Sequence, residues 1–595
     1  MKIKYTADFE TTPDPNDCRV WAWAICSINN LKEIYYGNDI VSFINKVREL
    51  ANCEIYFHNL RFDSQFIIWY LLKTGFRYVD SDNLKALTFN TLINGDNQIY
   101  KMEVCFNRKT WGKRHYYQKV VFYDSLKKLP FTVKKIAKDF QLPIQKLKMD
   151  YLAPRERGHI FTKDEKDYLR NDVEIMARAL AIQFDQGLTK MTIGSDALSS
   201  YKKMIGESEF KRRFPIIDPE TDHLLRKAYR GGWVYVNPKY QNKDIKKGKV
   251  YDVNSLYPWA MRAKENLYPI GLPRFDYGKY KKDASRPLYV QKFSCEFKLK
   301  KGYLPMIQVK NSLYYNGNEY LVDSEGIVDL TLCNVDLDLF FEHYDVWNID
   351  WICYWCFEAM QGMFDDYIDT WYKVKENSSG AIKQLAKLML NNLYGKFATS
   401  PDIIEKIPVV EDDAVKYIVQ KKYTKDAVYI PVGIFCTAYA RNKTIRTAQM
   451  EYDRFIYADT DSVHLDGDYE PEEMSKVIDD KKLGYWKNES NFERGRFLKA
   501  KSYVEEELTT REKYLENKKS KEPSALIYKR GNKYYHLNVK CAGMPDRIKE
   551  KVTFDNFKAG FTESGKLIPK NVKGGVILED TEFTIKDFEI NKIVE

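Results

Sequence analysis

The sequence predicts a multidomain α/β protein. At 595 residues the chain is too long for a single hydrophobic core, so we expect several domains. The N-terminal segment "IKYTADFETT" has the pattern of a strand, whereas "FTKDEKDYLRNDVEIMARAL" has the pattern of a helix. A hydrophobic content of 44% is ordinary for a soluble globular chain, and an aromatic content of 15% is high.

Charge and apolar segments limit the class of protein. Lys and Arg (95) exceed Asp and Glu (84), and the net charge of +11 is compatible with a polyanionic partner. The longest apolar run, residues 66–72, is too short to span a bilayer, and the opening residues lack a signal-peptide segment. Ten scattered cysteines are typical of reduced thiols. We therefore expect a cytoplasmic protein that does not enter a membrane.

Two motifs of other protein classes are incomplete. Cys353-Tyr-Trp-Cys356 lacks a second pair for a zinc site and lies in an aromatic, strand-like run, so we expect it to pack in a core. Residues 560–567, "GFTESGKL", have the spacing of a phosphate-binding loop. Leu567 stands where a hydroxyl is needed for Mg²⁺, and no clear strand precedes the segment. We interpret it as a surface turn.

Acidic residues lie beside apolar ones in the first third of the chain. Asp8 and Glu10 are two apart in the N-terminal strand, so they would share one face. Asp63 ends the apolar stretch "CEIYFHNLRFD". Each acid alone is more simply interpreted as a solvated surface charge.

A helix further on adds two polar side chains to this group. Thr162 and Glu165 form a capping box at its start, and Tyr168 and Asp172 lie four apart on one helical face. Four carboxylates and a tyrosine, spread over strand, loop and helix, are what a site for two divalent cations requires.

The segment 457–463, "YADTDSV", has two interpretations. If it is extended, Asp459 and Asp461 share a face, and their carboxylates repel unless a cation separates them. The composition is also that of a polar turn. A second acid, Asp252, follows the strand-like pair Val250-Tyr251.

The segment 378–397 predicts a helix that Ser378 or Ser379 can cap. Lys383, Lys387, Asn391 and Tyr394 fall within an arc of roughly 80°, and the apolar residues lie largely on the other side. An amphipathic helix with a lysine face in water is the simpler alternative. Combined with Asp252 and the acids of "YADTDSV", however, the lysines would neutralise a triphosphate at a two-metal site.

These segments resemble the motifs of protein-primed family-B DNA polymerases, the branch typical of small tailed phages with linear genomes. The three exonuclease motifs resemble Asp8-Phe-Glu10, Asn59-Leu-x-Phe-Asp63 and Tyr168-x-x-x-Asp172. Polymerase motifs A, B and C resemble Asp252-x-x-Ser-Leu-Tyr-Pro, Lys387-x-x-x-Asn391-x-Leu-Tyr394-Gly395 and Tyr457-x-Asp459-Thr460-Asp461-Ser. Lys501-Ser-Tyr503 and Tyr229-Arg-Gly-Gly232 match two further motifs of the branch.

Three features favour this branch over nucleic-acid-primed relatives. The chain is short for a proofreading replicative polymerase, and motif A follows closely on Tyr-x-Gly-Gly. About 130 residues separate motifs A and B, which leaves room for the insertion that contacts the terminal protein in this branch.

The resemblance implies a role for each matched residue. The catalytic residues would be Asp252, Asp459, Asp461, Asp8, Glu10, Asp63, Tyr168 and Asp172. Metal ligands would come from Asp252, Val253, Asp461, Asp8, Glu10, Asp63 and Asp172. The nucleotide would contact Ser255, Leu256, Tyr257, Lys383, Lys387, Asn391 and Tyr394. DNA would contact Thr11, Asn59, Phe62, Ser125, Leu126, Lys146, Tyr229, Gly231, Gly232, Gly395, Thr460, Lys501, Tyr503 and Lys540.

The same resemblance implies a ribonuclease-H-like exonuclease domain followed by a right-hand polymerase with two insertions. The expected parts are an exonuclease domain at 1–192, a palm at 193–262 and 428–503, an insertion contacting terminal protein at 305–362, fingers at 363–400, a second insertion for strand displacement and processivity at 401–427, and a thumb with the C-terminal segment at 504–595.

Cofactors and partners follow from the family as well. We expect two Mg²⁺ ions per active site, with Mn²⁺ as a substitute, and template-primer DNA and dNTPs as substrates. The expected partners are a terminal protein and a phage single-stranded-DNA-binding protein. The enzyme would act in the cytoplasm of the infected bacterium, as a monomer or as a heterodimer with terminal protein.

Two alternatives remain open, and one residue departs from the family pattern. The chain could be a family-B polymerase that starts from a nucleic-acid primer, or a nuclease whose C-terminal part only binds DNA. Asn392 replaces the serine usual in this branch, which would change nucleotide affinity or fidelity. The charged segment 509–536 is expected to be a hairpin or a mobile loop.

Overall fold

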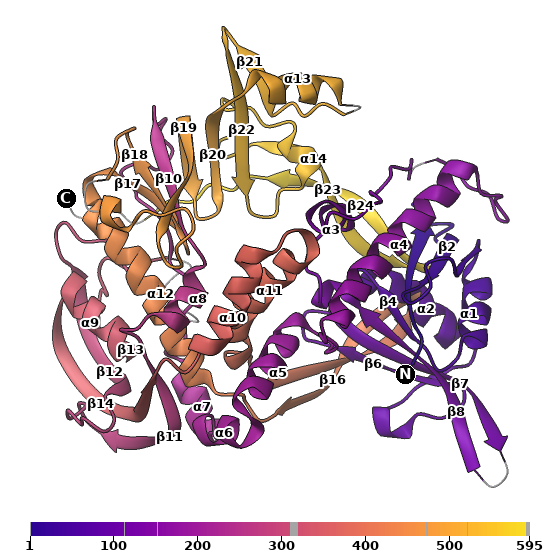
Figure 1. Cartoon of the computed structure of the whole chain (residues 1–595), viewed down its shortest axis with the longest axis horizontal. Coiled ribbons are helices and arrows are strands. Elements are labelled where there is room, and N and C mark those ends of the chain that lie inside the picture. Colours follow the sequence, from indigo (N-terminus) through magenta and orange to yellow (C-terminus); the bar gives the residue numbers. More distant parts are fainter. Residues whose placement is uncertain are drawn as a thin grey trace.

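The computed structural model is a multidomain α/β molecule (Figure 1). It describes residues 2–111, 114–151, 153–309, 319–471, 474–520 and 522–590. The fold class expected from the sequence is confirmed, because two large sheets in separate parts of the molecule each carry helices. Within the described residues, no helix is long and apolar enough to cross a membrane.

The N-terminal domain is built on a ten-stranded sheet, here called the N-terminal sheet. Its order is β16-β15-β6-β7-β8-β4-β1-β2-β3, with β5 beside β6. The strands from the first third are β1 Lys4–Thr11, β2 Val20–Ser27, β3 Ile34–Gly37, β4 Glu54–Phe57, β5 Arg77–Tyr78, β6 Thr88–Ile93, β7 Ile99–Trp111 and β8 Arg114–Asp124. The helices are α1 Ile40–Glu49, α2 Leu60–Lys73, α3 Val133–Asp139 and α4 Lys163–Asp185. β1 is interior, parallel to β4 and antiparallel to β2.

The central sheet has eight antiparallel strands in the order β21-β22-β20-β19-β10-β18-β17-β9. They are β9 Val234–Val236, β10 Gly248–Val253, β17 Phe455–Asp459, β18 Ser462–Asp466, β19 Trp486–Lys499, β20 Ser502–Thr509, β21 Ile527–Arg530 and β22 Lys533–Cys541. Helices α8 Leu256–Arg262 and α12 Ile430–Met450 pack against each other, and α12 also packs on β17 and β18. The sheet continues through β22, past the boundary expected at residue 503.

The segment between strands β10 and β17 of the central sheet forms a four-stranded sheet of its own, here called the insertion sheet. Its order is β11-β14-β12-β13, from β11 Leu267–Tyr277, β12 Leu288–Leu299, β13 Val328–Cys333 and β14 Tyr344–Gln361, and α9 Asn334–His343 packs on it. The unit starts at Leu267 and not at residue 305, because β14 pairs with both β11 and β12. Cys353 and Cys356 are buried in β14, as expected, and all ten cysteines are free.

Two helices form an antiparallel pair beside the central sheet: α10 Asp365–Asn377 and α11 Gly380–Phe397. Ser379 is the N-cap residue of α11, as expected, but its side chain makes no capping hydrogen bond, and the Ser378 hydroxyl donates to the Val374 carbonyl of α10. Helix α5 Ile193–Ile205, expected in the palm, packs on α11. Helices α6 Glu207–Arg213 and α7 Pro219–Arg226 follow.

A connecting hairpin, β15 Asp402–Glu411 and β16 Ala414–Thr424, leaves the helical pair and joins the N-terminal sheet. β15 pairs with β6 through Lys406 and Ile93. Trp69 Nε1 donates to the Asp413 carbonyl at the hairpin turn, over 3.1 Å. The segment expected as the second insertion therefore bridges two domains (Figure 1).

The C-terminal part also returns to the N-terminal domain. A C-terminal hairpin, β23 Thr562–Val572 and β24 Gly575–Thr584, packs on α2, and Cys18 Sγ donates to the Val576 carbonyl at 3.5 Å. The segment 560–567 thus leads into a strand, so its interpretation as a surface turn is wrong. The charged segment 509–536, expected to be a hairpin or a mobile loop, contains an exposed helix, α13 Arg511–Lys519, and then the hairpin of β21 and β22. Helix α14 Asp546–Lys549 follows.

A buried ion pair links the N-terminal domain to α5. Lys128 Nζ lies 2.8 Å from Asp196 Oδ2, and each side chain is 2% exposed. Lys128 also donates to the carbonyls of Leu188 and Lys190, at 3.0 and 2.6 Å. The pair fixes α5, and through it α11, to the N-terminal domain.

We expect Lys128→Met to lower the free energy of unfolding by about 3–5 kcal/mol, because it leaves Asp196 buried and unpaired. The measurement is urea unfolding followed by tryptophan fluorescence. Lys135→Met is the matched control: it removes an exposed pair with Asp139, which is worth about 0.5 kcal/mol. Equal losses in the two variants would contradict this role of the buried pair.

Candidate active sites

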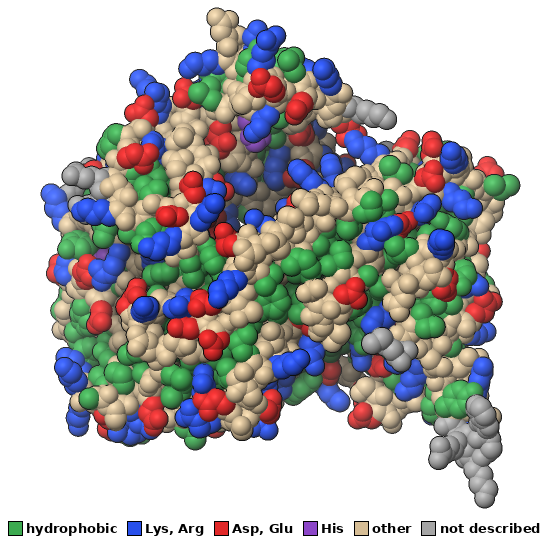
Figure 2. All heavy atoms as spheres, viewed as in Figure 1, with side chains coloured by type: hydrophobic (Ala, Val, Ile, Leu, Met, Phe, Trp, Pro, Cys, Tyr) green, Lys and Arg blue, Asp and Glu red, His purple; other side chains and the backbone are tan. Residues whose placement is uncertain are grey.

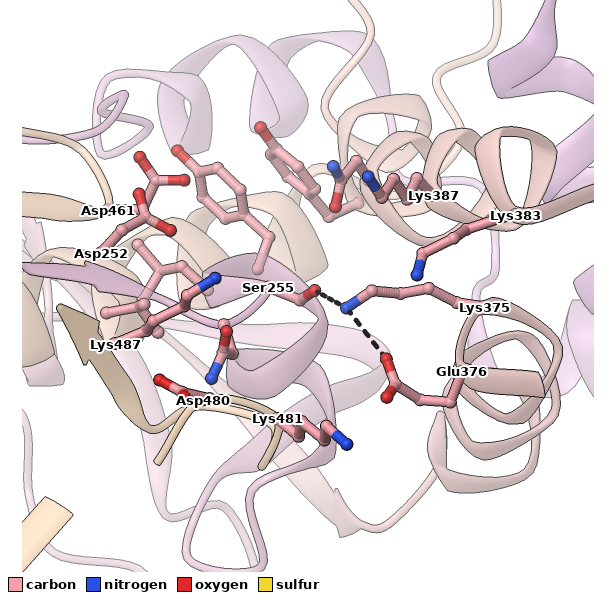
Figure 3. Close-up of a pocket in the computed structure, with 16 residues that line it drawn as sticks. Asp252, Ser255, Lys375, Glu376, Lys383, Lys387, Asp461, Asp480, Lys481 and Lys487 are labelled. Atoms are coloured by element: carbon pink, nitrogen blue, oxygen red, sulfur yellow. Dashed lines mark hydrogen bonds and ion pairs between the residues drawn. The ribbon is translucent and has the colours of Figure 1, made fainter. Parts of the chain in front are cut away.

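A pocket of about 640 Å³ opens between the central sheet and the helical pair (Figure 3). It is lined by Asp252, Val253, Asn254, Ser255, Leu256, Tyr257, Lys375, Glu376, Lys383, Lys387, Asn391, Tyr394, Asp461, Asp480, Lys481 and Lys487. Figure 2 shows a hollow in the middle of this face of the molecule, with Lys and Arg side chains inside it. Carboxylates from the central sheet thus face lysines from the helices, which suits a ligand carrying phosphate groups and metal ions.

Asp252 and Asp461 are brought together by neighbouring strands. Asp252 in β10 pairs with Ser462 of β18, and the Val253 N–H donates to the Asp461 carbonyl at 2.8 Å. Burial, together with Asp461, raises the pKa of Asp252 to about 8. Burial also raises the pKa of Asp461 to about 6, and Asp459 contributes. Two facing carboxylates that are largely removed from water form a binding site for hard divalent cations.

The "YADTDSV" segment is a hairpin and not a single strand. β17 ends at Asp459, Thr460 adopts a left-handed conformation with φ of 63°, and β18 begins at Ser462. The expectation that Asp459 and Asp461 share one strand face is therefore wrong, because the chain reverses between them. Asp461 lines the pocket, whereas Asp459 forms an ion pair of 3.4 Å with Lys501.

Lys501 and Tyr503, the two residues of the Lys-x-Tyr motif, lie beside this hairpin. The Lys501 N–H donates to the Tyr457 hydroxyl at 3.0 Å. The Tyr503 and Tyr457 rings lie 5.1 Å apart between centroids. Lys540 pairs with Tyr503 across β20 and β22, and its side chain is exposed. Lys501 and Lys540 thus supply positive charge next to Asp459 and Tyr503.

Helix α11 presents its predicted polar face to the pocket. Lys383, Lys387, Asn391 and Tyr394 all line it, while Leu385 and the other apolar residues of α11 pack in the core. Tyr394 stacks on Tyr257 with ring centroids 4.0 Å apart. The amphipathic interpretation of this helix holds, but its lysines face the pocket.

Residues flanking this face were predicted only in part. Ser255 has a left-handed φ of 60°, caps α8 and accepts a hydrogen bond of 3.3 Å from Lys375 Nζ. Lys375, near the end of α10, was not predicted because it belongs to no recognisable sequence motif. Asn392 does not line the pocket, because its side-chain amide donates to the Leu388 carbonyl at 2.8 Å. Gly395 is exposed on the last turn of α11.

The glycine motif packs against the motif C hairpin. A Cβ on Gly232 would collide with the side chain of Thr460, whose N–H donates to the Trp233 carbonyl at 2.8 Å. The Gly231 carbonyl accepts from Arg441 at 2.8 Å, and Tyr229 is half-buried beside the core. Only glycine at position 232 allows this close approach.

The N-terminal acids form a second cluster, here called the N-terminal carboxylate cluster. Asp8, Glu10 and Asp172 each have a carboxylate oxygen within 4.8 Å of the others. Asp63 joins them from the first turn of α2, and not from a loop as expected. Burial and then Asp172 raise the pKa of Asp8 to about 7, and burial raises the pKa of Glu10 and Asp63 far above the usual range.

The donors of this cluster fit divalent cations. All are carboxylate oxygens, and Asp172 Oδ1 is buried without a hydrogen-bond partner in the described structure. Buried carboxylates of this kind are stable in their ionised form only when a cation compensates their charge. The capping box of Thr162 and Glu165 is confirmed, and it fixes the start of the helix that carries Asp172.

Lys146 and Tyr168 belong to the same cluster. Lys146 Nζ forms an ion pair with Asp172 and donates to the Tyr168 hydroxyl at 2.9 Å. Tyr151, which was not predicted, lies with its hydroxyl 2.7 Å from that of Tyr168. Lys146 therefore lies at the carboxylates themselves.

The remaining predicted DNA contacts differ in accessibility. Thr11, Phe62 and Leu126 are half-buried near the cluster, and Asn59 begins α2 in a left-handed conformation. Ser125 has no exposed surface; its hydroxyl donates to the Phe57 carbonyl at 2.9 Å and lies 3.0 Å from His58 Nδ1. The Ser125 hydroxyl is thus used inside the fold, and the contact of Ser125 with DNA stays a prediction.

Comparisons with known proteins agree with these two sites. The family model described as DNA polymerase type B, organellar and viral, matches residues 44–163 and 154–480. A DNA polymerase of Bacillus phage M2 is 47% identical over 585 residues, which cover 98% of this chain and 99% of that one.

Two solved structures of Phi29 DNA polymerase have the same fold. The complex with primer-template DNA and incoming nucleotide substrates gives a TM-score of 0.90 at 45% identity, covering 98% of this chain and 100% of that chain. The complex with single-stranded DNA gives a TM-score of 0.90 at 43% identity, with the same coverage.

The raised carboxyl pKa values predict a stabilisation by Mg²⁺ that grows with pH. The pKa of an unfolded aspartate is about 4, whereas burial raises the pKa of Asp8 to about 7 and that of Asp252 to about 8 in the folded protein. The folded protein therefore holds more protons than the unfolded one between these values, and its stability falls as pH rises through that range. A bound cation removes the repulsion between the ionised groups.

We expect Mg²⁺ to raise the midpoint of thermal unfolding more at pH 8 than at pH 5.5, measured by differential scanning fluorimetry against EDTA. Asp63→Asn removes one buried carboxyl group that would ionise when a cation binds, so it should lessen the difference between the two pH values. A Mg²⁺ effect of the same size at both pH values would refute the coupling.

Proposed function

Because the chain belongs to the type B DNA polymerases, in the protein-primed branch of the Bacillus phage enzymes, we propose that its two sites divide synthesis and proofreading between them. The chain is a DNA polymerase with a 3′–5′ exonuclease. The family model extends over residues 154–480, which include motifs A, B and C. A nuclease with a C-terminal part that only binds DNA is therefore excluded.

The central pocket is the proposed site of nucleotide addition. Asp252 and Asp461, with the Val253 carbonyl, would hold two Mg²⁺ ions, or Mn²⁺ in their place, and Asp459 would support them. When bound, such ions supply the charge that activates the primer hydroxyl and stabilises the leaving pyrophosphate. The single observation that supports this assignment best is the placement of Asp252 and Asp461 opposite lysines in one pocket.

The helical side of the pocket would bind the nucleotide itself. Lys383 and Lys387 would contact the triphosphate, and Asn391, Ser255 and Leu256 would line its approach. Tyr257 and Tyr394, stacked at 4.0 Å, would pack against the sugar and the nascent base pair. Tyr257 would also exclude a ribose 2′-hydroxyl by its bulk.

The N-terminal carboxylate cluster is the proposed proofreading site. Asp8, Glu10, Asp63 and Asp172 would hold two metal ions, and the Tyr168 hydroxyl would orient the attacking water. A relative is known in complex with single-stranded DNA, which is the form in which a mispaired 3′ end would arrive. Thr11, Asn59 and Phe62 would guide that end, with Leu126 beside them.

Other segments are assigned to the DNA path and the partners. Lys501, Tyr503 and Lys540 would steady the primer, and the loop from Tyr229 to Gly232, packed on Thr460, would hold the template near motif C. The connecting hairpin would enclose the template and separate its complementary strand. The insertion sheet would contact the terminal protein. Template-primer DNA and incoming nucleotides are the proposed substrates, as in the solved complex of the relative.

The division of labour predicts opposite phenotypes for two alanine variants. Asp461→Ala should lower primer extension by about 10²–10³-fold and leave degradation of a single-stranded 3′ end intact. Asp63→Ala should do the reverse. Both activities are measured on labelled oligonucleotides, and thermal melting confirms that each variant folds. Loss of both activities in each folded variant would contradict separate sites.

Priming by a protein predicts a covalent product. Incubation with a candidate terminal protein, origin DNA, Mg²⁺ and one labelled dNTP should transfer the labelled nucleotide to the protein. The reaction should stop with Asp461→Ala and continue with Asp63→Ala. Normal extension of an oligonucleotide primer, with no labelled protein from any candidate encoded beside this chain, would favour a nucleic-acid primer.

A further inference from the structure

Lys487 extends into the central pocket from the sheet side, opposite the lysines of the helical pair. In the antiparallel pairing of β10 and β19 it is the direct partner of Asp252. Directly paired residues point to the same face of a sheet, with Cβ atoms about 5 Å apart. Lys487 lines the pocket, and Figure 3 shows its ammonium group directed inward below Asp252.

The ammonium group of Lys487 is available to a ligand. Its side chain is exposed to the pocket, and in the described part of the chain no hydrogen bond or ion pair joins it to another side chain. Lys375, by contrast, is held by Ser255 at 3.3 Å and by Glu376 at 3.8 Å.

Negative charge on the sheet side favours such a cation, although Lys481 also lines the pocket. Asp252, Asp461 and Asp480 all line the pocket there, and their carboxylates repel the phosphates of an incoming nucleotide. Metal ions bound by Asp252 and Asp461 compensate part of this repulsion. Lys487 adds a positive charge at a place which the lysines of α11, on the opposite wall, do not cover (Figure 3).

We propose that Lys487 binds the phosphate groups of the incoming nucleotide from the central sheet and thereby positions the triphosphate over Asp252 and Asp461. This inference rests on the proposed function of the pocket and adds a phosphate-binding residue that belongs to no polymerase motif found in the sequence. The ligand class is a polyphosphate: a nucleoside triphosphate, or the pyrophosphate that leaves it.

The location of Lys487 determines the kinetic effect. At Lys487, β19 is paired with β10, and the adjacent Trp486 forms a bridge with Ile478 on the other side, so Lys487 is on an element held by backbone hydrogen bonds. It would contact the phosphates whether or not the helical pair moves during the reaction. Binding of that kind is equal in the ground state and the transition state, and its loss raises KM without lowering kcat.

The test compares Lys487→Met with the matched control Lys482→Met. Lys482 is a lysine of the preceding loop whose ammonium donates to the Tyr485 hydroxyl at 2.5 Å and which does not line the pocket. In primer extension, Lys487→Met should raise KM for dNTP about five- to tenfold, as for one exposed charge-assisted hydrogen bond, with kcat within about twofold. Lys482→Met should leave both constants within about twofold of the original, and Lys487→Arg should restore KM.

A second measurement is independent of catalysis and of metal ions. Binding of inorganic tripolyphosphate in EDTA, followed by calorimetry, should weaken about five- to tenfold in Lys487→Met and should be unchanged in Lys482→Met. Exonuclease activity should be unchanged in both variants, which also shows that they are folded.

Two outcomes would overturn the inference. One is a KM for dNTP within about twofold of the original in Lys487→Met; if the Mg²⁺ requirement rises at the same time, Lys487 acts only on the ionisation of Asp252. The other is an unchanged affinity for tripolyphosphate. In each case the original enzyme would still extend a primer; failure of that extension would instead contradict the proposed function.

Discussion

Repulsion between buried carboxylates is the constraint on which the two sites depend. In the N-terminal cluster, Asp8, Glu10 and Asp172 lie within 4.8 Å of one another, and in the central pocket Asp252 faces Asp461. Such arrangements are unfavourable for a chain that only has to fold, because charges removed from water are costly unless they are paired. Their presence in both sheets indicates that each site is completed by a bound cation.

The two sheets reach this arrangement by different routes. In the N-terminal domain a strand, the start of α2 and the helix α4 converge, so the acids come from segments far apart in the sequence. In the central sheet a tight hairpin turns Asp461 back towards the neighbouring strand that carries Asp252. The positive φ of Thr460 makes this turn, and Gly232 leaves room for it. Local backbone geometry thus decides which acid of motif C faces the pocket.

Sequence reasoning identified the residue types and the local elements more reliably than their partners. The capping box of Thr162 and the polar face of α11 depend on residues three to four apart, and both were predicted. Contacts between distant segments gave no such signal. Neither the burial of Ser125 behind His58 nor the approach of Lys146 to Asp172 can be inferred from spacing, because each depends on how two separate segments pack.

Dependence on contacts between distant segments also explains why two pocket lysines and the end of the central sheet were not predicted. Lys375 and Lys487 enter the pocket through the end of one helix and the register of one strand pair, which no short pattern encodes. The central sheet continues to Cys541 because β22 pairs with β20, and that pairing could not be seen in a charged segment.

The cores of this molecule are shared between parts that the motifs would separate. Val415 of the connecting hairpin and Val576 and Ile577 of the C-terminal hairpin belong to the same apolar cluster as the strands of the N-terminal domain. A fragment cut after residue 192 would therefore expose the apolar surface that these three side chains cover, and would be prone to self-association. An exonuclease domain exchanged between related enzymes would therefore have to include both hairpins. Packing, as well as chemistry, ties the N-terminal domain to the rest of the chain.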